Sequence, residues 1–360
     1  VWVGLGLGSS ASRRSRLGSL GLRSLGVRGS GLRDWGLKGL RARPLWGFEA
    51  EEQRDMSTRS TSAPQGQKKP QTPGGGGFLD LPPAQGAIVD IGVNLQHKSF
   101  AKSLPAILQR AQDQGVAGIV ITGTSESSSE AALALATKYD RGSSSAQAPA
   151  AQSQLRRRLY CTAGYHPHDA KKWTPESPER LRTIFRQGQG VCMAVGECGL
   201  DFNRNFSPRP VQEAVFRAHI ELALELGLPL FCHEREASST FLAIIDEFPA
   251  LDPARVCVHC FTGAENELKE YVKRGFYVGF TGCVCDEKRG KGLRQILGLV
   301  PPNRLMIETD APFMMPTGGR GRNEPSNLPA VLRTVAQCLG QTEEKMAEIT
   351  TANAVCFFGL

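Results

Sequence analysis

The sequence predicts an α/β fold in which eight strands alternate with helices and close into a barrel. Eight short runs rich in Val, Ile, Leu, Phe, Met and Cys follow one another from residue 87 onward, separated by helix-like stretches. This composition is typical of strands buried on both faces of a parallel sheet. Four of the runs end in a side chain that commonly binds metal: Glu197, His233, His259 and Asp310. Because all strand C-termini of such a barrel lie at one rim, we expect the four side chains to converge.

The elements are expected in regular alternation over residues 86–360, which we predict to form one barrel domain. The predicted strands are 87–95, 116–123, 159–166, 193–200, 228–234, 255–261, 276–282 and 305–311. The predicted helices are 100–114, 126–138, 175–187, 209–227, 237–248, 264–274 and 289–299, with a final pair at 326–339 and 343–357. A doubly wound open sheet is the alternative, but no Gly-rich phosphate-binding turn follows the first run. Residues 141–155 are a low-complexity loop.

Residues 1–85 are rich in Gly, Ser, Arg, Gln and Pro and show no sustained helical or strand period. We therefore predict a disordered, low-complexity extension and linker, because such a segment buries too little apolar surface to offset the entropy of ordering. The chain starts at Val1, and its first methionine is Met56. Residues 1–55 are either translation upstream of the true start or an organelle presequence, since they are rich in Arg and Ser.

The formal net charge of +8 is concentrated at the start of the chain, where residues 1–45 hold nine Lys and Arg against one Asp. The remainder is formally neutral, so global charge gives no support for nucleic-acid binding. The spacing of the ten cysteines does not resemble a disulfide framework, which favours a reducing intracellular compartment. We expect a cytoplasmic or nuclear protein, or a mitochondrial one if residues 1–55 are a genuine presequence. No apolar stretch reaches the roughly 18 residues that span a bilayer, and no protein partner is readable.

The four strand-end side chains predict a divalent metal site. Two carboxylates and two imidazoles supply the anionic and neutral donors that such an ion needs. His166 ends the third predicted strand at the same rim, as a ligand, a phosphate contact or a proton donor to a leaving group. Asp201 is expected to orient a ligand indirectly. His168 and Asp169 lie on the following loop, where exposure is the default, and His219 lies inside a helix, where a structural role is expected.

Basic residues follow the last strand in the stretch GGRGRNEP. In many barrels the loops after strands seven and eight bind phosphate. We therefore expect Arg320 and Arg322 to grip a substrate phosphate with both arms of the guanidinium. Arg204, Arg235, Lys288 and Arg289 are weaker candidates, because solvated surface charges need no function.

Several motifs, in order along residues 87–360, resemble those of the TatD family of metal-dependent deoxyribonucleases. They are DIGVNL, ITGT, TAGYHPHD, GECGLDFNRNF, HCFTG, GFTGCVCDEKRG, IETDAP and RNEP. The resemblance implies a (β/α)8 TIM barrel of the amidohydrolase superfamily that hydrolyses DNA phosphodiester bonds. It also implies 3′-5′ exonuclease action, helped by Mg²⁺ or a similar ion, with Mn²⁺ and Zn²⁺ as alternatives. Glu197, His233, His259 and Asp310 match the family's metal ligands position for position.

The first strand departs from many members of that family, which carry His-x-His as ligands for a second metal. Here Gly92 and Asn94 stand at those positions. Glycine has no donor, and Asn94 is at best a weak ligand through its amide oxygen. We therefore expect one well-bound ion in the free protein and a second only alongside DNA phosphate. Restoring both histidines is expected to strengthen the second site if the strand tolerates the bulk.

The predicted activity is thus hydrolysis of DNA at single-stranded or frayed ends. Asp310 is the candidate that takes the proton from water, and His166 assists the departing oxygen. One alternative is a hydrolase of a small amide or of an aminoacyl-tRNA ester on the same barrel, since fold does not fix substrate. Another is a non-catalytic binding barrel, which the four intact ligands argue against.

Overall fold

The computed structural model describes residues 82–139, 158–319 and 321–360. The predictions for residues 1–81, for the loop at 141–155 and for Arg320 therefore lie outside the described residues. Eight parallel strands pair in sequence order from β1 to β8. A parallel bridge between Val93 and Ala311 brings β8 back to β1, so the sheet closes. The predicted eight-stranded barrel is confirmed.

Most strands are short and fully buried, as their apolar runs predicted. Their bounds are β1 Ile88–Val93, β2 Val116–Ile121, β3 Leu159–Ala163, β4 Cys192–Asp201, β5 Leu230–Arg235, β6 Val256–Val258, β7 Tyr277–Phe280 and β8 Leu305–Ile307. The sixth and eighth strands end earlier than predicted. Their backbones turn into the left-handed region soon afterwards, with φ of 45° at Cys260 and 50° at Asp310. Such a conformation costs a residue with a side chain about 1–3 kcal/mol, and here it redirects the two segments that carry His259 and Asp310.

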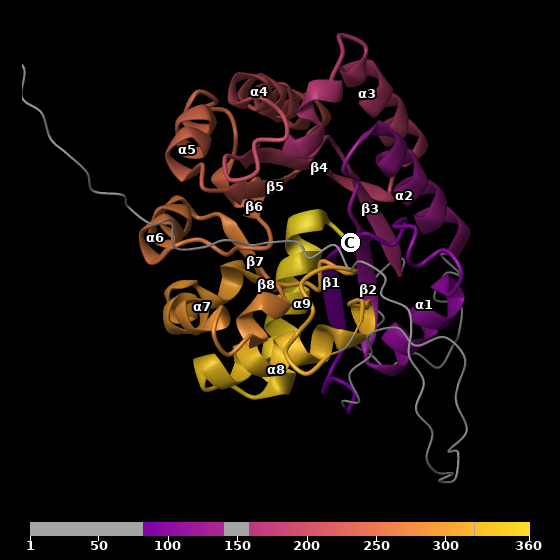
Figure 1. Ribbon diagram of the computed structural model, residues 1–360, viewed down its shortest axis with the longest axis vertical. Helices are drawn as coiled ribbons and strands as arrows, with labels where there is room; N and C mark the ends of the chain where they lie inside the picture. Colours follow the sequence, from indigo (N-terminus) through magenta and orange to yellow (C-terminus); the bar gives the residue numbers. More distant parts are fainter. Residues whose placement is uncertain (1–81, 140–157, 320) are drawn as a thin grey trace, which may run out of the picture. The chain divides into compact units, whose positions relative to one another are not determined.

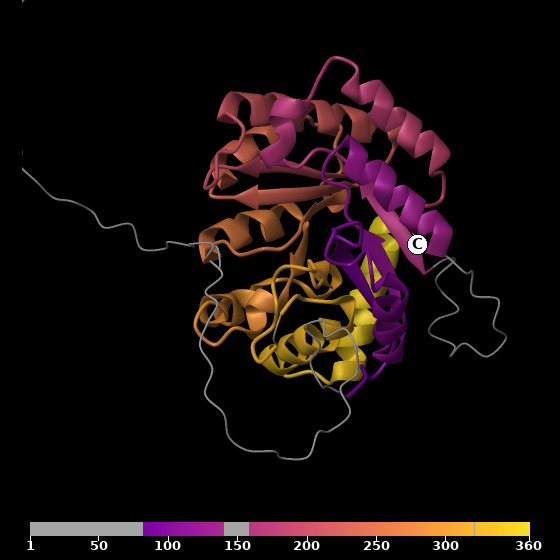
Figure 2. The ribbon, with the colours of Figure 1, turned by 45° about the vertical axis from the view of Figure 1, so that its right-hand side comes forward.

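Helices surround the strands, as Figures 1 and 2 show. They are α1 Leu104–Asp113, α2 Glu126–Tyr139, α3 Ser177–Gln187, α4 Arg209–Leu226, α5 Ser238–Asp246, α6 Glu265–Arg274, α7 Gly290–Ile296, α8 Leu328–Leu339 and α9 Glu343–Phe358. Short 3₁₀ segments join them, of which Pro167–Lys172 lies beside the rim. None of the helices in the described ranges is long and apolar enough to cross a membrane.

The barrel has an outer core against the helices and an inner core that α9 completes. Phe357 and Phe358 of α9 pack with inward-facing strand residues such as Tyr160, Phe231 and Met306. The Asn353 side chain donates hydrogen bonds to the carbonyls of Pro302 and Leu305, which precede and begin β8. Helix α9 therefore fills the N-terminal end of the barrel and leaves the opposite rim for a site.

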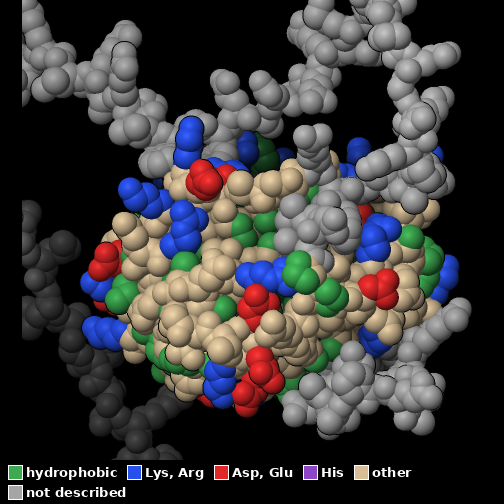
Figure 3. Space-filling model, turned by 90° about the horizontal axis from the view of Figure 1, so that it is seen from below, with side chains coloured by type: hydrophobic (Ala, Val, Ile, Leu, Met, Phe, Trp, Pro, Cys, Tyr) green, Lys and Arg blue, Asp and Glu red, His purple; other side chains and the backbone are tan. Residues whose placement is uncertain are grey.

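The surface of the barrel mixes charges of both signs. On the face shown in Figure 3, single Lys and Arg side chains alternate with Asp and Glu among hydrophobic and neutral groups. Several of the described surface charges pair directly, as Arg182 does with Glu225 and Arg217 with Glu247. This agrees with the formally neutral barrel expected from the sequence.

The described chain contacts the barrel before the predicted domain boundary. Ala84 N–H donates to Gln114 O at 3.1 Å, and Arg333 donates to the carbonyls of Pro82 and Pro83. We predict that a chain beginning at Pro82 keeps the full melting temperature. A chain beginning at Gly86 should lose about 1 kcal/mol of unfolding free energy, because these hydrogen bonds are absent. Its melting temperature, measured by calorimetry, should fall by roughly 2–4 °C. Equal melting temperatures for the two chains would show that residues 82–85 add no stability.

Candidate metal centre

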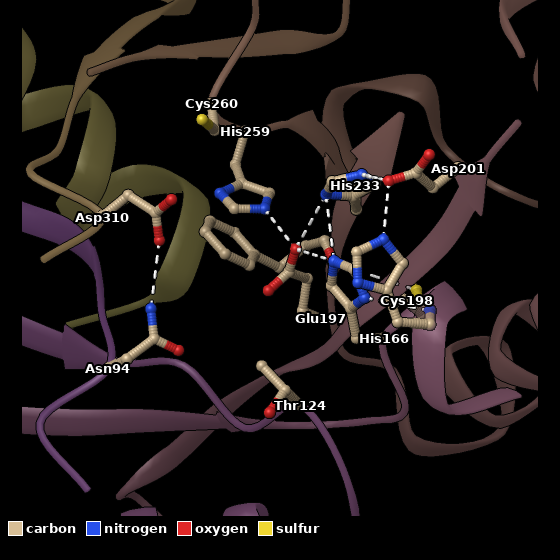
Figure 4. Close-up of polar contacts among 12 residues, drawn as sticks. Asn94, Thr124, His166, Glu197, Cys198, Asp201, His233, His259, Cys260 and Asp310 are labelled. Atoms are coloured by element: carbon tan, nitrogen blue, oxygen red, sulfur yellow. Dashed lines mark hydrogen bonds and ion pairs between the residues drawn. The ribbon is translucent and has the colours of Figure 1, made fainter. Parts of the chain in front are cut away.

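The sequence-predicted side chains meet at the carboxyl ends of the strands (Figure 4). Glu197 lies on β4 and His233 on β5, while His259 follows β6 by one residue. His166 lies three residues beyond β3 and Asp310 three residues beyond β8. Segments far apart in the sequence thus reach one place because parallel strands of a barrel share their carboxyl ends.

A single oxygen of Glu197 is the centre of the cluster. Its Oε1 lies 2.8 Å from His259 Nε2, 3.1 Å from His233 Nδ1 and 3.3 Å from His166 Nε2. Burial by itself would raise the pKa of this carboxyl, but the imidazoles of His166 and His259 hold the pKa well below its usual range. Glu197 is therefore a buried carboxylate surrounded by nitrogen.

The contacts of the far nitrogens divide the three histidines into two kinds. His259 Nδ1 lies 3.2 Å from Glu308 Oε2, and His233 Nε2 lies 3.4 Å from Asp201 Oδ2. The other nitrogen of each ring faces Glu197 Oε1, so both rings lie between carboxylates. Burial opposes the shift, but these carboxylates raise the pKa of both rings, that of His233 to about 9. A cation beside Glu197 would displace the proton from His259 Nε2 and His233 Nδ1, while Glu308 and Asp201 keep the proton on the opposite nitrogens.

His166 has the opposite tautomer. Its Nδ1 accepts a hydrogen bond from the backbone N–H of His168 at 3.1 Å, so its Nε2 carries the proton. Burial lowers the pKa of His166 to about 4, which keeps the ring neutral. The ligand atoms of His166, Glu197 and His233 lie within 4.8 Å of one another. Distance alone thus groups all three as ligands, whereas the hydrogen bonds make His166 a donor.

This set of donors fits a divalent cation. One carboxylate oxygen has two lone pairs, but three imidazole nitrogens approach Glu197 Oε1 within 3.3 Å. In addition, His166 Nε2 and His233 Nδ1 lie 3.2 Å apart. Two neutral nitrogens and carboxylates are the donors that zinc and similar ions take, with oxygen donors suited to magnesium and manganese.

Asp310 lies on the other side of the cluster, paired with Asn94. The Asn94 side-chain amide donates to Asp310 Oδ1 at 3.1 Å, which leaves the Asn94 oxygen free of that bond. Burial, with added repulsion from Glu197 and Glu308, raises the pKa of Asp310 to about 8, although His259 opposes the shift. The structure thus places Asp310 beside the first strand, apart from the three-histidine contacts of Glu197.

Asp201 supports the centre from behind. Its Oδ2 accepts a hydrogen bond from His168 Nε2 at 2.7 Å and faces His233 Nε2. Its Oδ1 accepts backbone N–H bonds from Asn203 and Arg204. Burial opposes these contacts, but together they lower the pKa of Asp201 well below its usual value. Asp201 is thus fixed as a carboxylate that orients His233.

Glu308 is a site residue that the sequence reasoning missed. It has no exposed surface, faces His259 Nδ1 and accepts the N–H of Cys260 at 2.6 Å. It therefore fixes the ring of His259 as Asp201 fixes that of His233. The signal was present in the sequence, because Glu308 stands two residues before Asp310 and side chains two apart in extended chain share a side.

Two residues of the RNEP stretch have structural contacts that the sequence analysis did not predict. Arg322 is exposed, but Asn323 and Glu324 are buried and act on the structure. Asn323 donates to the carbonyl of Thr309 at 2.9 Å, and Glu324 holds Arg110 of α1 through two hydrogen bonds of 2.9 Å. The motif thus anchors the segment that carries Glu308 and Asp310. A phosphate contact of Arg322 stays a prediction.

The contact between Gly92 and Glu308 gives a structural reason for glycine at this position of the first strand. A Cβ at this position would lie 2.1 Å from Glu308 Oε2, so the carboxylate of Glu308 fills the space of a larger side chain. Histidines restored at positions 92 and 94 would therefore require the carboxylate of Glu308 to move, and the stronger second metal site expected from them stays a prediction that depends on this movement.

We predict that Gly92→Ala destabilises the protein by about 2 kcal/mol, since overpacking a core costs about 1–3 kcal/mol. In a Glu308→Ala background the added cost should nearly vanish, as measured by urea unfolding of the four chains of the cycle. Gly292→Ala is the matched control, because its Cβ meets nothing within 4 Å and Ala favours a helix. Additive effects at positions 92 and 308 would contradict the shared space.

The chain is similar to known proteins over most of its length. A family model described as TatD related DNase matches residues 89–359. A protein of Enterobacter lignolyticus named 3′-5′ ssDNA/RNA exonuclease TatD is 42% identical over 276 residues, covering 75% of this chain and 98% of the relative. Its namesake in Salmonella typhimurium is 40% identical over 274 residues, with the same coverage. The solved structure of YJJV, a TatD homologue from Escherichia coli, covers 76% of this chain and 98% of its own at 25% identity, with a TM-score of 0.66. The chain belongs to the TatD family of DNases.

Proposed function

We propose that the protein is a metal-dependent exonuclease that removes nucleotides from the 3′ end of single-stranded DNA. The observation that carries the proposal is the convergence of His233 and His259 on Glu197 at the barrel rim, in a chain of this family. The relatives that are 40–42% identical are named as exonucleases of single-stranded DNA and RNA, which supports an unpaired strand as substrate. Mg²⁺ is the proposed ion, with Mn²⁺ or Zn²⁺ as alternatives.

The metal would be held by Glu197, His233 Nδ1 and His259 Nε2, with Asp310 as a further oxygen donor or proton acceptor. A bound divalent ion supplies polarisation of the phosphoryl oxygen and a lowered pKa of water. Glu308 and Asp201 keep the two ligand histidines in the required tautomer. With Gly92 and Asn94 on the first strand, we propose one well-bound ion in the free protein and a second that depends on substrate phosphate.

Two residues move or hold protons in this proposal. Asp310 would accept a proton from the attacking water only as a carboxylate, so a bound cation would have to offset the burial that raises its pKa to about 8. His166 presents a protonated Nε2 toward the cluster. As a neutral donor it is suited to hold a phosphate oxygen and to assist the departing oxygen.

All ten cysteines are free, which supports a reducing intracellular compartment.

A labelled single-stranded oligonucleotide tests the reaction. We expect shortening from the 3′ end in the presence of Mg²⁺, and none with EDTA, followed on a sequencing gel with a label at either end. Double-stranded DNA, RNA, an amide and an aminoacyl ester are assayed beside it. Hydrolysis of the ester or amide alone would sink the nuclease proposal.

His233→Ala should lower bound metal and activity together, by at least about tenfold each, because it removes one of two neutral nitrogen donors. His166→Ala should lower kcat with bound metal unchanged, because we assign it as a donor. Metal content is measured by elemental analysis after dialysis. Equal metal loss in both variants would contradict the division between them.

His219→Gln is the control for loss of a buried histidine. The His219 ring accepts a hydrogen bond from the N–H of Tyr165 and contacts the carbonyl of Val215. Both partners are backbone groups, and neither is a carboxylate. We expect lower stability with metal content preserved.

A further inference from the structure

Two exposed aromatic rings lie at the rim that carries the metal centre. Among the described residues, the exposed large hydrophobic side chains are Phe206, Leu224, Leu299 and Phe313. The two phenylalanines have 54% and 52% of their surface exposed, although Phe is among the residues most often buried. Both follow the carboxyl end of a strand, whereas Leu224 and Leu299 lie where the chain has returned toward the N-terminal end of the barrel.

Phe206 is connected to the centre through two imidazoles in edge-to-face contact. Its ring stands edge-on to His168, with centroids 4.7 Å apart and planes at 67°. His168 in turn packs on His166 at 4.3 Å. The backbone carbonyl of Phe206 accepts a hydrogen bond from Lys171 Nζ at 3.0 Å, so an ammonium group lies at the backbone of this residue.

Phe313 is connected to the centre through the backbone. Its N–H donates to the carbonyl of Asp310 at 3.0 Å. Its ring stands edge-on to His97, with centroids 5.9 Å apart and planes at 71°. Burial lowers the pKa of His97, and the charges of Lys98 and Arg322 add to that shift. Positive charge therefore lies near this ring as well.

The two rings flank the centre from opposite sides. Phe206 follows β4 and Phe313 follows β8, and these strands are four places apart in a closed ring of eight. The loops after them therefore leave the rim on opposite sides of the barrel axis. A basic side chain accompanies each ring: Lys171, from the segment after β3, at Phe206, and Arg322, from the segment after β8, near His97.

We propose that Phe206 and Phe313 stack on unpaired bases on either side of the phosphate that is cleaved, and so clamp the end of a single strand. The inference rests on the proposed nuclease function and names what binds at its rim. Every base offers a π face, so stacking on an exposed ring is tolerant of sequence, and the nearby cations suit the phosphate backbone. Bases within a duplex already stack on one another, so the clamp selects unpaired ends.

Phe206→Leu and Phe313→Leu test the clamp, because leucine keeps an apolar side chain and removes the ring. We expect each to raise KM for a single-stranded oligonucleotide about tenfold, the low end of base-aromatic stacking, with kcat within about twofold. Phe206→Trp keeps an aromatic ring and should therefore bind the oligonucleotide as tightly as the wild type, unlike Phe206→Leu. An oligonucleotide that lacks bases at its last two 3′ nucleotides should bind wild type and both Leu variants equally weakly.

Leu224→Ala and Leu299→Ala are matched controls for loss of an exposed apolar side chain, and should leave KM unchanged. Fluorescence anisotropy of a labelled strand in EDTA measures binding without cleavage. Cleavage by wild type with unchanged KM and Kd in both Leu variants would overturn the clamp and leave the nuclease proposal standing. Binding that depends on the two rings, without any cleavage by the wild type, would overturn the nuclease proposal and leave the clamp standing.

Discussion

The arrangement at the rim depends on one buried carboxylate, Glu197, which holds three imidazoles around a single oxygen. A charge in this position is costly unless it is compensated. His259, His233 and His166 compensate it from three different strand ends. The closed barrel makes this convergence rigid, because each strand is held by neighbours on both sides and the inner core is filled from below by α9.

A second ring of contacts decides what each imidazole does. Glu308 and Asp201 face the outer nitrogens of His259 and His233, while a backbone N–H faces His166. Identical side chains thereby become two lone-pair donors and one proton donor. Asp90 extends this support, since it accepts from the N–H and hydroxyl of Thr309 and so fixes the residue between Glu308 and Asp310.

The sequence predicted the architecture well because its signals were local. Apolar runs and helical periods located all eight strands, and a polar residue ending a run located Glu197, His233, His259 and Asp310. What it could not predict depended on tertiary contacts. The partners of Asn323 and Glu324, the carbonyl of Thr309 and the guanidinium of Arg110, come together only in the folded barrel, so the structural role of these two residues could not be predicted from the sequence. Likewise, the division of labour among the histidines follows from hydrogen bonds that no spacing reveals.

The space shared by residues 92 and 308 links two positions that are more than two hundred residues apart in the sequence. With glycine at position 92, the carboxylate of Glu308 alone occupies the shared space. A bulky side chain at position 92 would overlap with that carboxylate. Replacing Glu308 by a smaller residue would leave a void beside His259. It would also remove the carboxylate that orients the ring of His259. Each single change is therefore unfavourable in this chain. The two positions should consequently be treated as one unit whenever the first strand is redesigned.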